Sequence, residues 1–220
     1  MIARVTIAGE DLVLCAERAI HWPRRRMLFV ADPHFGKAAT FRALGLKVPH
    51  GTTEEGLARL DRLLSAHDVG TLVFLGDFLH AREGRSAATF EALTEWRAEH
   101  PEVAMQIVRG NHDRRAGDPP SSVGIECVDA PHAASPFMLA HHPAEHPGSY
   151  VLAGHLHPCA TLQGAARQRE RLPCFWFGEG VGVLPAFGDF TGCAEVSARP
   201  TDSVWVIAED HVVQVTRQES

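Results

Sequence analysis

Apolar and polar positions follow a regular order along the first half of the chain. Three apolar runs, at 27–32, 71–77 and 103–111, are short enough for buried strands, and each closes on polar residues. The segments between them, 51–68 and 86–100, instead carry apolar residues at the spacing of one helix face. This order of strand, helix, strand, helix and strand predicts βαβ units with parallel strands.

The second half of the chain has a different pattern. Residues 136–143 and 150–158 are strand-like, and they leave little room for a helix between them. Further β-rich segments follow at 174–177, 181–187, 203–210 and 211–215. We therefore predict a second sheet that faces the first. Because no fixed-period repeat or long polar linker divides the sequence, we expect residues 1–220 to form a single domain.

The strong apolar runs of both halves end in residue types that bind metal ions or transfer protons. Ligand sites of α/β sheets form beyond the carboxyl ends of the strands, so we expect these side chains to converge. Packing alone does not require such residues at five strand ends. The residues are Asp32, His34, Asp77, Asn111, His112, Asp113, His141, His142, His155 and His157.

These residue types indicate divalent metal ions. Carboxylate, imidazole and amide oxygen together suit Mn, Fe or Zn, and the absence of cysteine from the set disfavours a structural zinc site. The candidate ligands are too many for one tetrahedral ion, but they suffice for two ions that share the carboxylate of Asp77. Two ions about 3.5–4 Å apart can clamp a phosphate and generate a hydroxide nucleophile near neutral pH.

The stretch RGNHDRR, from Arg109 to Arg115, places several of these groups side by side. Gly110 permits a tight turn at the strand end. We expect Asn111 to present its amide oxygen to a metal, and His112 to face the substrate as a general acid or as a stabiliser of phosphoryl oxygens. Asp113 is expected to hold the imidazole of His112 in the required tautomer.

Bulk composition limits the classes of function. The formal net charge of −6 argues against non-specific coating of nucleic acid, but not against an enzyme that grips it locally. The five cysteines include no Cys-x-x-Cys pair, so we expect reduced thiols and no disulfide framework. No run of about 18 apolar residues and no signal-peptide pattern is found. We expect a cytoplasmic protein without a membrane partner.

The motifs also resemble a known family. In order, DPH, GD, GNHD, a strand-end histidine and GHLH resemble the five signatures of the calcineurin-like metallophosphoesterases. Longer stretches such as DPHFGKAATFRALGLKVPHGTT, GNHDRRAGD and YVLAGHLHP resemble the ligase-associated phosphodiesterase (PdeM) branch. The resemblance covers nearly the whole chain, from about Met27 to Thr191.

This resemblance implies a fold and a setting. The fold is α/β, a four-layer αββα sandwich in which two mixed sheets are flanked by helices. The site is dinuclear and hydrolyses phosphodiesters, with Mn²⁺ as the favoured ion and Fe or Zn as alternatives. The implied role is bacterial DNA repair beside a DNA ligase and a helicase.

The matching motifs also imply a role for each residue. They assign Asp32, His34 and His157 to one ion, Asn111, His141 and His155 to the other, Asp77 to both, and catalysis to His112 with Asp113 beside it. His142 follows His141 where the superfamily usually has glycine, so the ligand assignment of this pair could be reversed. His80 stands where many relatives carry an acid, and no role is assigned to it.

Three functions stay open at this point. The leading one is a metal-dependent phosphodiesterase that acts on nucleic acid, DNA above all, with a metal-bridging hydroxide as nucleophile. An endonuclease would be one form of it. The second is a phosphomonoesterase or a cyclic-nucleotide phosphodiesterase that acts on small molecules. The third is a non-catalytic repair scaffold stabilised by its metals. The sequence leaves strand preference and oligomeric state undecided.

Overall fold

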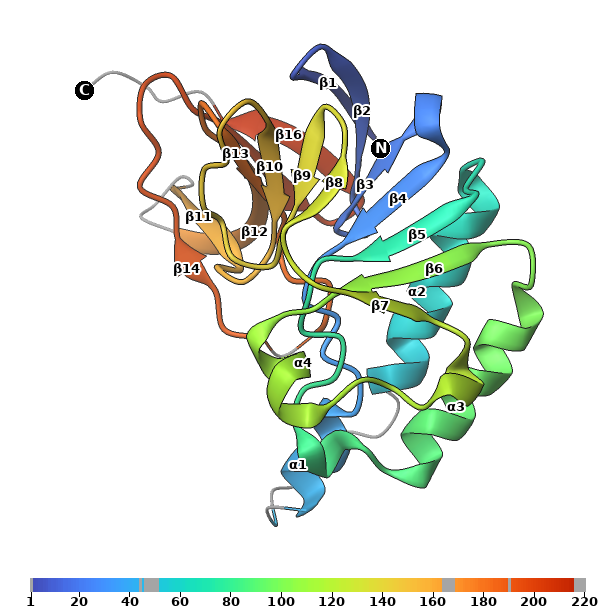
Figure 1. Cartoon of the computed structure of the whole chain (residues 1–220). Coiled ribbons are helices and arrows are strands. Elements are labelled where there is room, and N and C mark those ends of the chain that lie inside the picture. The colour runs from blue at the N-terminus through green and yellow to red at the C-terminus, as the bar shows by residue number, and fades with distance from the viewer. Residues whose placement is uncertain (1, 44, 46–51, 164–168, 190, 216–220) are drawn as a thin grey trace.

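Two mixed β-sheets face one another in this protein (Figure 1). A computed structural model describes residues 2–43, 45, 52–163, 169–189 and 191–215. The blue-to-green part of the chain forms the first sheet, and the yellow-to-red part forms the second.

The first sheet has seven strands in sequence order from β1 to β7. Neighbouring strands pair antiparallel from β1 to β4 and parallel from β4 to β7. The parallel strands therefore bring their carboxyl ends to the same edge of the sheet. The strands are β1 Ala3–Ile7, β2 Glu10–Cys15, β3 Ala19–Trp22, β4 Met27–Val30, β5 Thr71–Phe74, β6 Ala104–Val108 and β7 Glu126–Val128.

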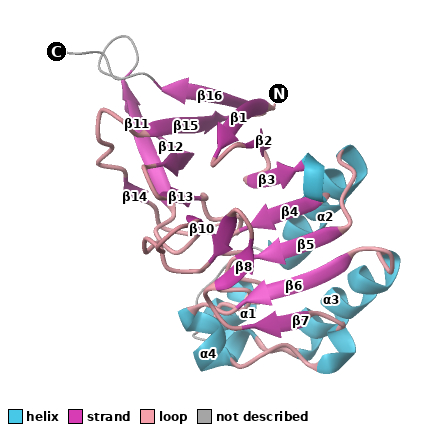
Figure 2. Ribbon diagram, turned by 45° about the horizontal axis from the view of Figure 1, so that its top comes forward, coloured by secondary structure: helices cyan, strands magenta, loops and turns pink. Residues whose placement is uncertain are grey.

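Helices connect the parallel strands and cover the face of the first sheet that points away from the second sheet (Figure 2). They are α1 Lys37–Ala43, α2 Thr52–Ala66, α3 Ala87–Glu99 and α4 Asn111–Ala116, with three short 3₁₀ turns, η1 Pro23–Arg25, η2 Arg82–Gly84 and η3 Ser121–Val123. The helices predicted over 51–68 and 86–100 are confirmed as α2 and α3.

The second sheet runs in the order β14-β11-β12-β13-β10-β9-β8, and β15 adds to β12 and pairs with β16. Its members are β8 His132–Ala134, β9 Phe137–Leu139, β10 Tyr150–Ala153, β11 Pro158–Gln163, β12 Arg169–Phe177, β13 Val181–Val183, β14 Ala194–Glu195, β15 Ser203–Ala208 and β16 His211–Val215. Strands β9 and β10 pair in parallel, as do β10 and β13. The carboxyl ends of β9 and β10 therefore lie together.

Two apolar clusters flank the first sheet because successive residues of a strand point to opposite faces. In β4, Leu28 and Val30 belong to the cluster beneath the helices, whereas Phe29 belongs to the cluster between the sheets. Trp22 joins that second cluster, and its ring packs edge-on against Phe137 of the opposite sheet, with 5.0 Å between centroids. This shared core holds the strand ends of the two sheets at a fixed separation.

The expected fold class, α/β with two mixed sheets, is confirmed, whereas the described residues form a helical layer on the first sheet only and not the outer helical layer expected on the second. The described residues contain no helix after η3, so the helices gather on the first sheet. The second sheet has a small apolar cluster of its own around Cys174, Val204 and Val206. No helix in the described part of the chain has the length and apolar character that crossing a membrane requires.

The antiparallel strands β1, β2 and β3 were not predicted from the sequence. Residues of β1 alternate between half-buried and exposed, so their apolar signal is weak. The connection to β2 consists of Ala8 and Gly9, both with positive φ, as two-residue hairpins require. Gly9 was the signal that would have located this hairpin.

A pair of histidines lies beside the helical cluster of the first sheet. His21 in β3 is buried, its ring lies 4.7 Å from that of His67, and its Nε2 lies 3.3 Å from the carbonyl oxygen of Asp68. Burial is the main cause that lowers the pKa of His21 below its usual value of 6.5. As the pH falls through 6.5, the unfolded chain therefore takes up a proton before the folded protein does, and stability is lost.

We predict that His21→Gln makes stability less sensitive to acid. Glutamine can still donate to the carbonyl of Asp68, but it takes up no proton. Between about pH 7 and about pH 5, the free energy of unfolding of the variant should fall less steeply with pH than that of the wild type. The difference between the two slopes should correspond to the uptake of up to about one proton per molecule. Urea unfolding at several pH values measures both slopes, with the exposed His211→Gln as control. Equal slopes for wild type and variant would contradict the prediction.

Candidate metal centre

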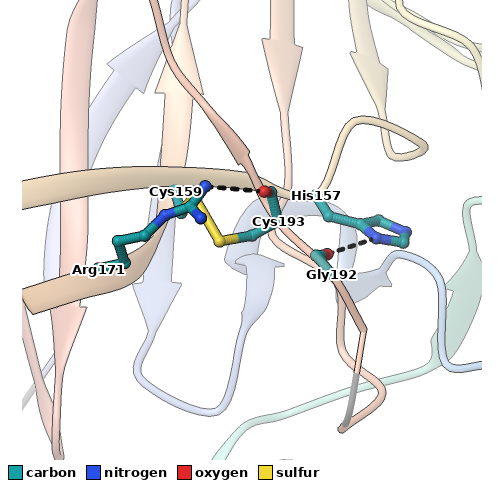
Figure 3. The surroundings of a disulfide bond; sticks show 5 residues. All are labelled: His157, Cys159, Arg171, Gly192 and Cys193. Carbon is teal, nitrogen blue, oxygen red and sulfur yellow. Dashed lines mark hydrogen bonds between the residues drawn. A yellow bond between two sulfur atoms is a disulfide. The ribbon is translucent and has the colours of Figure 1, made fainter.

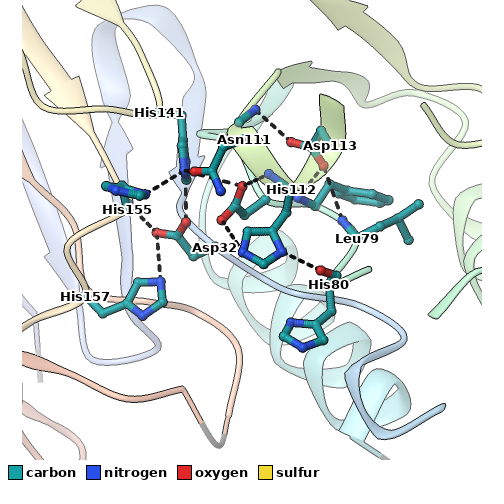
Figure 4. A network of polar contacts seen from close by, with 12 residues as sticks. Asp32, Leu79, His80, Asn111, His112, Asp113, His141, His155 and His157 are labelled. Atoms are coloured by element: carbon teal, nitrogen blue, oxygen red, sulfur yellow. Dashed lines mark hydrogen bonds and ion pairs between the residues drawn. The ribbon is translucent and has the colours of Figure 1, made fainter. Parts of the chain in front are cut away.

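The candidate ligands from the two sheets meet where the carboxyl ends of their strands face one another (Figure 4). Each ligand lies in the loop or helix start that directly follows a strand. Asp32 and His34 follow β4, Asp77 follows β5, Asn111 follows β6, His141 follows β9, and His155 and His157 follow β10. The convergence expected from the strand-end pattern is therefore present in the fold.

The first cluster consists of Asp32, His34 and His157, whose ligand atoms all lie within 4.8 Å of one another. Asp32 is fully buried at 0% exposure, and its Oδ2 accepts a hydrogen bond of 2.8 Å from the backbone N–H of His155. Its Oδ1 is buried and makes no hydrogen bond with the described residues, and Nδ1 of His141 lies 3.5 Å away. Such an oxygen is costly unless a donor or a cation approaches it.

The second cluster is built around His141. Its Nε2 lies 3.0 Å from Oδ1 of Asn111 and 3.0 Å from Nδ1 of His155. Its Nδ1 lies 3.1 Å from the carbonyl oxygen of Leu75, which can only accept a hydrogen bond. The proton of neutral His141 therefore sits on Nδ1, and Nε2 offers its lone pair to the centre.

Asp77 lies between the two clusters. Its Oδ1 accepts a hydrogen bond of 2.9 Å from the backbone N–H of His112 and lies 3.3 Å from Nε2 of His141. The ligand atoms of Asp32, Asp77 and His141 also lie within 4.8 Å of one another. Burial raises the pKa of Asp77 above its usual value. A cation between the two carboxylates would offset that effect.

The structure distinguishes the two adjacent histidines after β9. His141 is only 1% exposed and contacts Asn111, whereas the exposed His142 stacks on His155 with 4.1 Å between ring centroids. The buried position of His141 favours it as the residue that faces both clusters. The ligand atoms of His141, His142 and His155 nevertheless lie within 4.8 Å of one another, so His142 borders the second cluster from its exposed side.

Backbone strain is concentrated at the candidate ligands. Non-glycine residues with positive φ are uncommon, and they persist where the surrounding structure enforces them, often at functional sites. Five of the described ones are candidate ligands: Asp32 (52°), His34 (51°), Asp77 (50°), His155 (70°) and His157 (48°). The fold therefore bends several loops into an unfavourable conformation to aim these side chains at one point.

The backbone of His80 orients His112. Nδ1 of His112 lies at hydrogen-bond distance from the carbonyl oxygen of His80, and the two rings stack with 5.6 Å between centroids. Because a carbonyl only accepts, Nδ1 carries the proton, and Nε2 is turned toward Asp77, whose Oδ2 is 3.9 Å away. His80 also joins His34 and His112 in a cluster whose ligand atoms lie within 4.8 Å of one another.

The expectation that Asp113 orients the imidazole of His112 is wrong. Oδ1 of Asp113 accepts from the backbone N–H groups of Phe78 and Leu79 at 2.9 and 3.4 Å. Its Oδ2 accepts from the N–H of Gly110 at 2.8 Å, which closes the first turn of α4. Asp113 is adjacent to His112 in sequence, but in a helix neighbouring side chains point in different directions. Asp113 instead joins the loop after β5 to α4.

The cluster residues have protonation states that suit metal ligands. Burial is the main cause that lowers the pKa of His34 to about 2 and that of His141 to about 4, so both imidazoles are neutral near pH 7. Burial also acts to lower the pKa of His157, but contact with Asp32 raises it overall. A metal ion bound between His157 and Asp32 would replace that proton. Nδ1 of His34 and Nε2 of His157 are buried and make no hydrogen bond with the described residues, and Nε2 of His157 lies 3.7 Å from Oδ2 of Asp32, where a shared cation would fit.

A disulfide bond lies beside this centre (Figure 3). Cys159 and Cys193 are bonded although 34 residues separate them, so the expectation of reduced thiols is wrong for this pair and confirmed for Cys15, Cys127 and Cys174. The carbonyl oxygen of Gly192, next to Cys193, lies 3.1 Å from Nδ1 of His157. The disulfide thus ties the segment that orients His157 to β11. Neither cysteine has a local signal that would reveal the pairing.

Comparison with known proteins agrees with this geometry. Residues 25–134 match the model of the calcineurin-like phosphoesterase family. The crystal structure of Pseudomonas putida nuclease MPE has a TM-score of 0.87 and 45% sequence identity, and the alignment covers 98% of this chain and 100% of that one. A protein of unknown function from Aquifex aeolicus, AQ665, is 19% identical with a TM-score of 0.40 over 60% of this chain and 78% of its own, too weak a likeness for inference. No curated protein matches the chain.

We predict that Gly110→Ala disrupts the centre. A Cβ atom at this position would lie 2.4 Å from Oδ1 of Asp77 and 2.9 Å from Cγ of His141. Because these groups are buried, the methyl group must displace them, and we expect the affinity for Mn²⁺ to fall at least about 10-fold. Paramagnetic resonance of unbound Mn²⁺ measures the affinity. Gly180→Ala is the control, because its nearest atom would lie 3.5 Å away. Equal losses in both variants would contradict this explanation.

We also predict that Cys193→Ser weakens metal binding. Without the bond to Cys159, the carbonyl of Gly192 is held less firmly, and His157 loses its fixed orientation. Calorimetric titration of metal-free protein should show an affinity about 10-fold lower at one site. Wild-type protein treated with a phosphine reductant should behave in the same way, and Cys127→Ser should bind as the oxidised wild type does. Unchanged affinity in both the variant and the reduced protein would disprove the link.

Proposed function

Because the chain belongs to the calcineurin-like phosphoesterase family, we propose that it is a phosphodiesterase that acts on nucleic acid. Membership makes it a metal-dependent phosphoester hydrolase. The Pseudomonas putida relative is named a nuclease, which supports a phosphodiester of nucleic acid as the substrate class. The observation that carries the proposal is the convergence of ligand side chains from both sheets around two buried carboxylates, Asp32 and Asp77.

The family uses divalent metal ions, and we propose that this chain holds two. Asp32, His34 and His157 would hold one ion, Asn111, His141 and His155 the other, and Asp77 would contact both. Oxygen and imidazole ligands without thiolate favour Mn²⁺, with Fe or Zn as alternatives. When bound, such ions clamp a phosphate and lower the pKa of water so that hydroxide forms near neutral pH.

The side chains around the proposed ions have separate tasks. His112 would place Nε2 toward the phosphoryl oxygens or the leaving oxygen, because its Nδ1 is engaged by the carbonyl of His80. Asp113 would affect the reaction only indirectly, because it holds the loop after β5 against the first turn of α4 and so keeps the residues of both segments in place. The buried Asp32 would keep His155 and His157 in place through its contacts with both.

The wider setting is proposed from the resemblance of the sequence motifs. We propose a cytoplasmic, single-domain enzyme over residues 1–220 that takes part in DNA repair in association with a DNA ligase and a helicase.

The proposed activity predicts metal-dependent hydrolysis of a simple phosphodiester. Protein stripped with chelator and reloaded with Mn²⁺ should hydrolyse bis-p-nitrophenyl phosphate faster than p-nitrophenyl phosphate. Asn111→Ala removes one proposed ligand and should lower kcat about 100-fold or more. Gln106→Ala is the matched control, because this amide lies in β6 and donates to Glu126.

Each result of this assay favours one of the functions considered. Preference for the monoester would move the substrate class to small phosphomonoesters. Two bound ions without turnover of either ester would favour a metal-stabilised scaffold. Turnover that resists chelation and is indifferent to Asn111→Ala would place the chemistry elsewhere in the molecule.

A further inference from the structure

A cavity of about 370 Å³ lies directly beside the candidate metal centre. Asn111 and His141 belong to the wall of the cavity and also contact one another in the centre. The remaining wall comes from α4 and from residues in and around β9 and β10. The volume of the cavity falls within the range of about 300–1,000 Å³ typical of small-ligand sites. A group joined to a phosphate at the centre would therefore reach this cavity.

Much of the cavity wall is apolar. It contains Met138 in β9, Ala140 after that strand, Val151 in β10, and the neighbouring Ala130 and Pro131. Methionine is flexible, and its sulfur makes favourable contacts with aromatic rings. An apolar wall with a thioether suits a flat aromatic group better than a hydrated sugar or an anion.

Two polar groups of the wall indicate which aromatic group would fit. His146 lines the cavity, and an imidazole can form a hydrogen bond with a polar atom at the edge of a ring. Glu145 also lines the cavity, and its negative charge opposes a second phosphate there. A nucleobase meets both conditions, because it is aromatic, uncharged and polar at its edge.

The two arginines of the cavity wall differ in their availability. Arg109 is engaged by Asp118 at 2.7 Å and by Asp129 at 3.2 Å, so its charge is largely offset. Arg114 is exposed on α4, one turn after Asn111, and forms no ion pair with the described residues. Arg114 is therefore available to bind a phosphate that flanks the one at the metal centre.

We propose that this cavity binds the nucleobase of the nucleotide on one side of the scissile phosphodiester, with Met138 and Val151 against the ring and Arg114 on the next phosphate. This inference rests on the proposed function, since it assumes a nucleic-acid phosphodiester at the centre. The proposal adds that the enzyme contacts one base next to the cleaved bond and does not bind the nucleic acid through its sugar–phosphate backbone alone.

Dinucleotides with a single cleavable bond test the proposal. Three substrates are compared: thymidylyl-thymidine and its two analogues in which one thymine is replaced by hydrogen. Loss of one thymine should lower kcat/KM roughly 5- to 100-fold, the range expected for one stacked base, and loss of the other should change it by less than about 2-fold. The side that matters identifies the nucleotide in the cavity.

A variant that fills the cavity provides the second readout. Met138→Trp should lower kcat/KM for thymidylyl-thymidine to the value of the sensitive analogue, so the ratio between these two substrates should approach one. The matched control is Met27→Trp, at the start of β4 and outside the cavity wall, and it should keep the wild-type ratio. Because the readout is a ratio, partial unfolding of either variant does not alter it.

Arg114→Gln tests the flanking phosphate. It should reduce cleavage of a longer single-stranded oligonucleotide, which has such phosphates, more than cleavage of the dinucleotide, which has none. Arg115→Gln, at the exposed neighbouring position, should affect both substrates equally. Equal effects of Arg114→Gln on both substrates would overturn the assignment of this arginine.

Activity on bis-p-nitrophenyl phosphate in the same preparations separates the two proposals. Turnover of that diester, with all three dinucleotides cleaved equally well or not at all, would overturn the nucleobase cavity and leave the phosphodiesterase function standing. An enzyme with bound metal that cleaves none of the diesters would overturn both.

Discussion

Two carboxylates, Asp32 and Asp77, are buried close together after adjacent parallel strands, and the rest of the site depends on this arrangement. Removing an ionised carboxylate from water costs several kcal/mol unless other groups compensate. Backbone N–H groups of His155 and His112 supply part of the compensation. Oδ1 of Asp32 makes no hydrogen bond with the described residues and has only Nδ1 of His141 at 3.5 Å, so a cation would supply the remainder. Because burying these two carboxylates without a cation costs free energy, the site is suited to bind a divalent metal ion.

The packing of the two sheets makes this arrangement possible. Neither sheet has the full set of candidate ligands, because His141 and His155 come from the second sheet and Asp32, Asp77 and Asn111 from the first. The apolar cluster between the sheets fixes the distance across which they meet. Strain in the loops follows from this constraint, since the strand ends are held by the core and the side chains must still converge. Gly110 leaves room at a point where Asp77 and His141 both approach the backbone.

The centre and the neighbouring cavity have complementary chemistry. The centre is rich in carboxylate and imidazole and suits metal and phosphate, whereas the cavity wall around Met138 and Val151 is mostly apolar. Asn111 and His141 belong to both, so a phosphate and the group esterified to it would be held by a common wall. Such a division would allow the metal centre to act on many phosphodiesters while the cavity selects the group attached to the phosphate.

By itself, the sequence determined the strand ends, helices α2 and α3 and the residue types at the centre, because apolar periodicity and turn chemistry are local. It also placed Asp77 between two ligand groups. Only the tertiary structure decided that His80 and not Asp113 orients His112, that His141 and not His142 lies inside, and that Cys159 meets Cys193. Each of these depends on distances and directions between segments remote in sequence, and such distances are set by the packing of the whole chain.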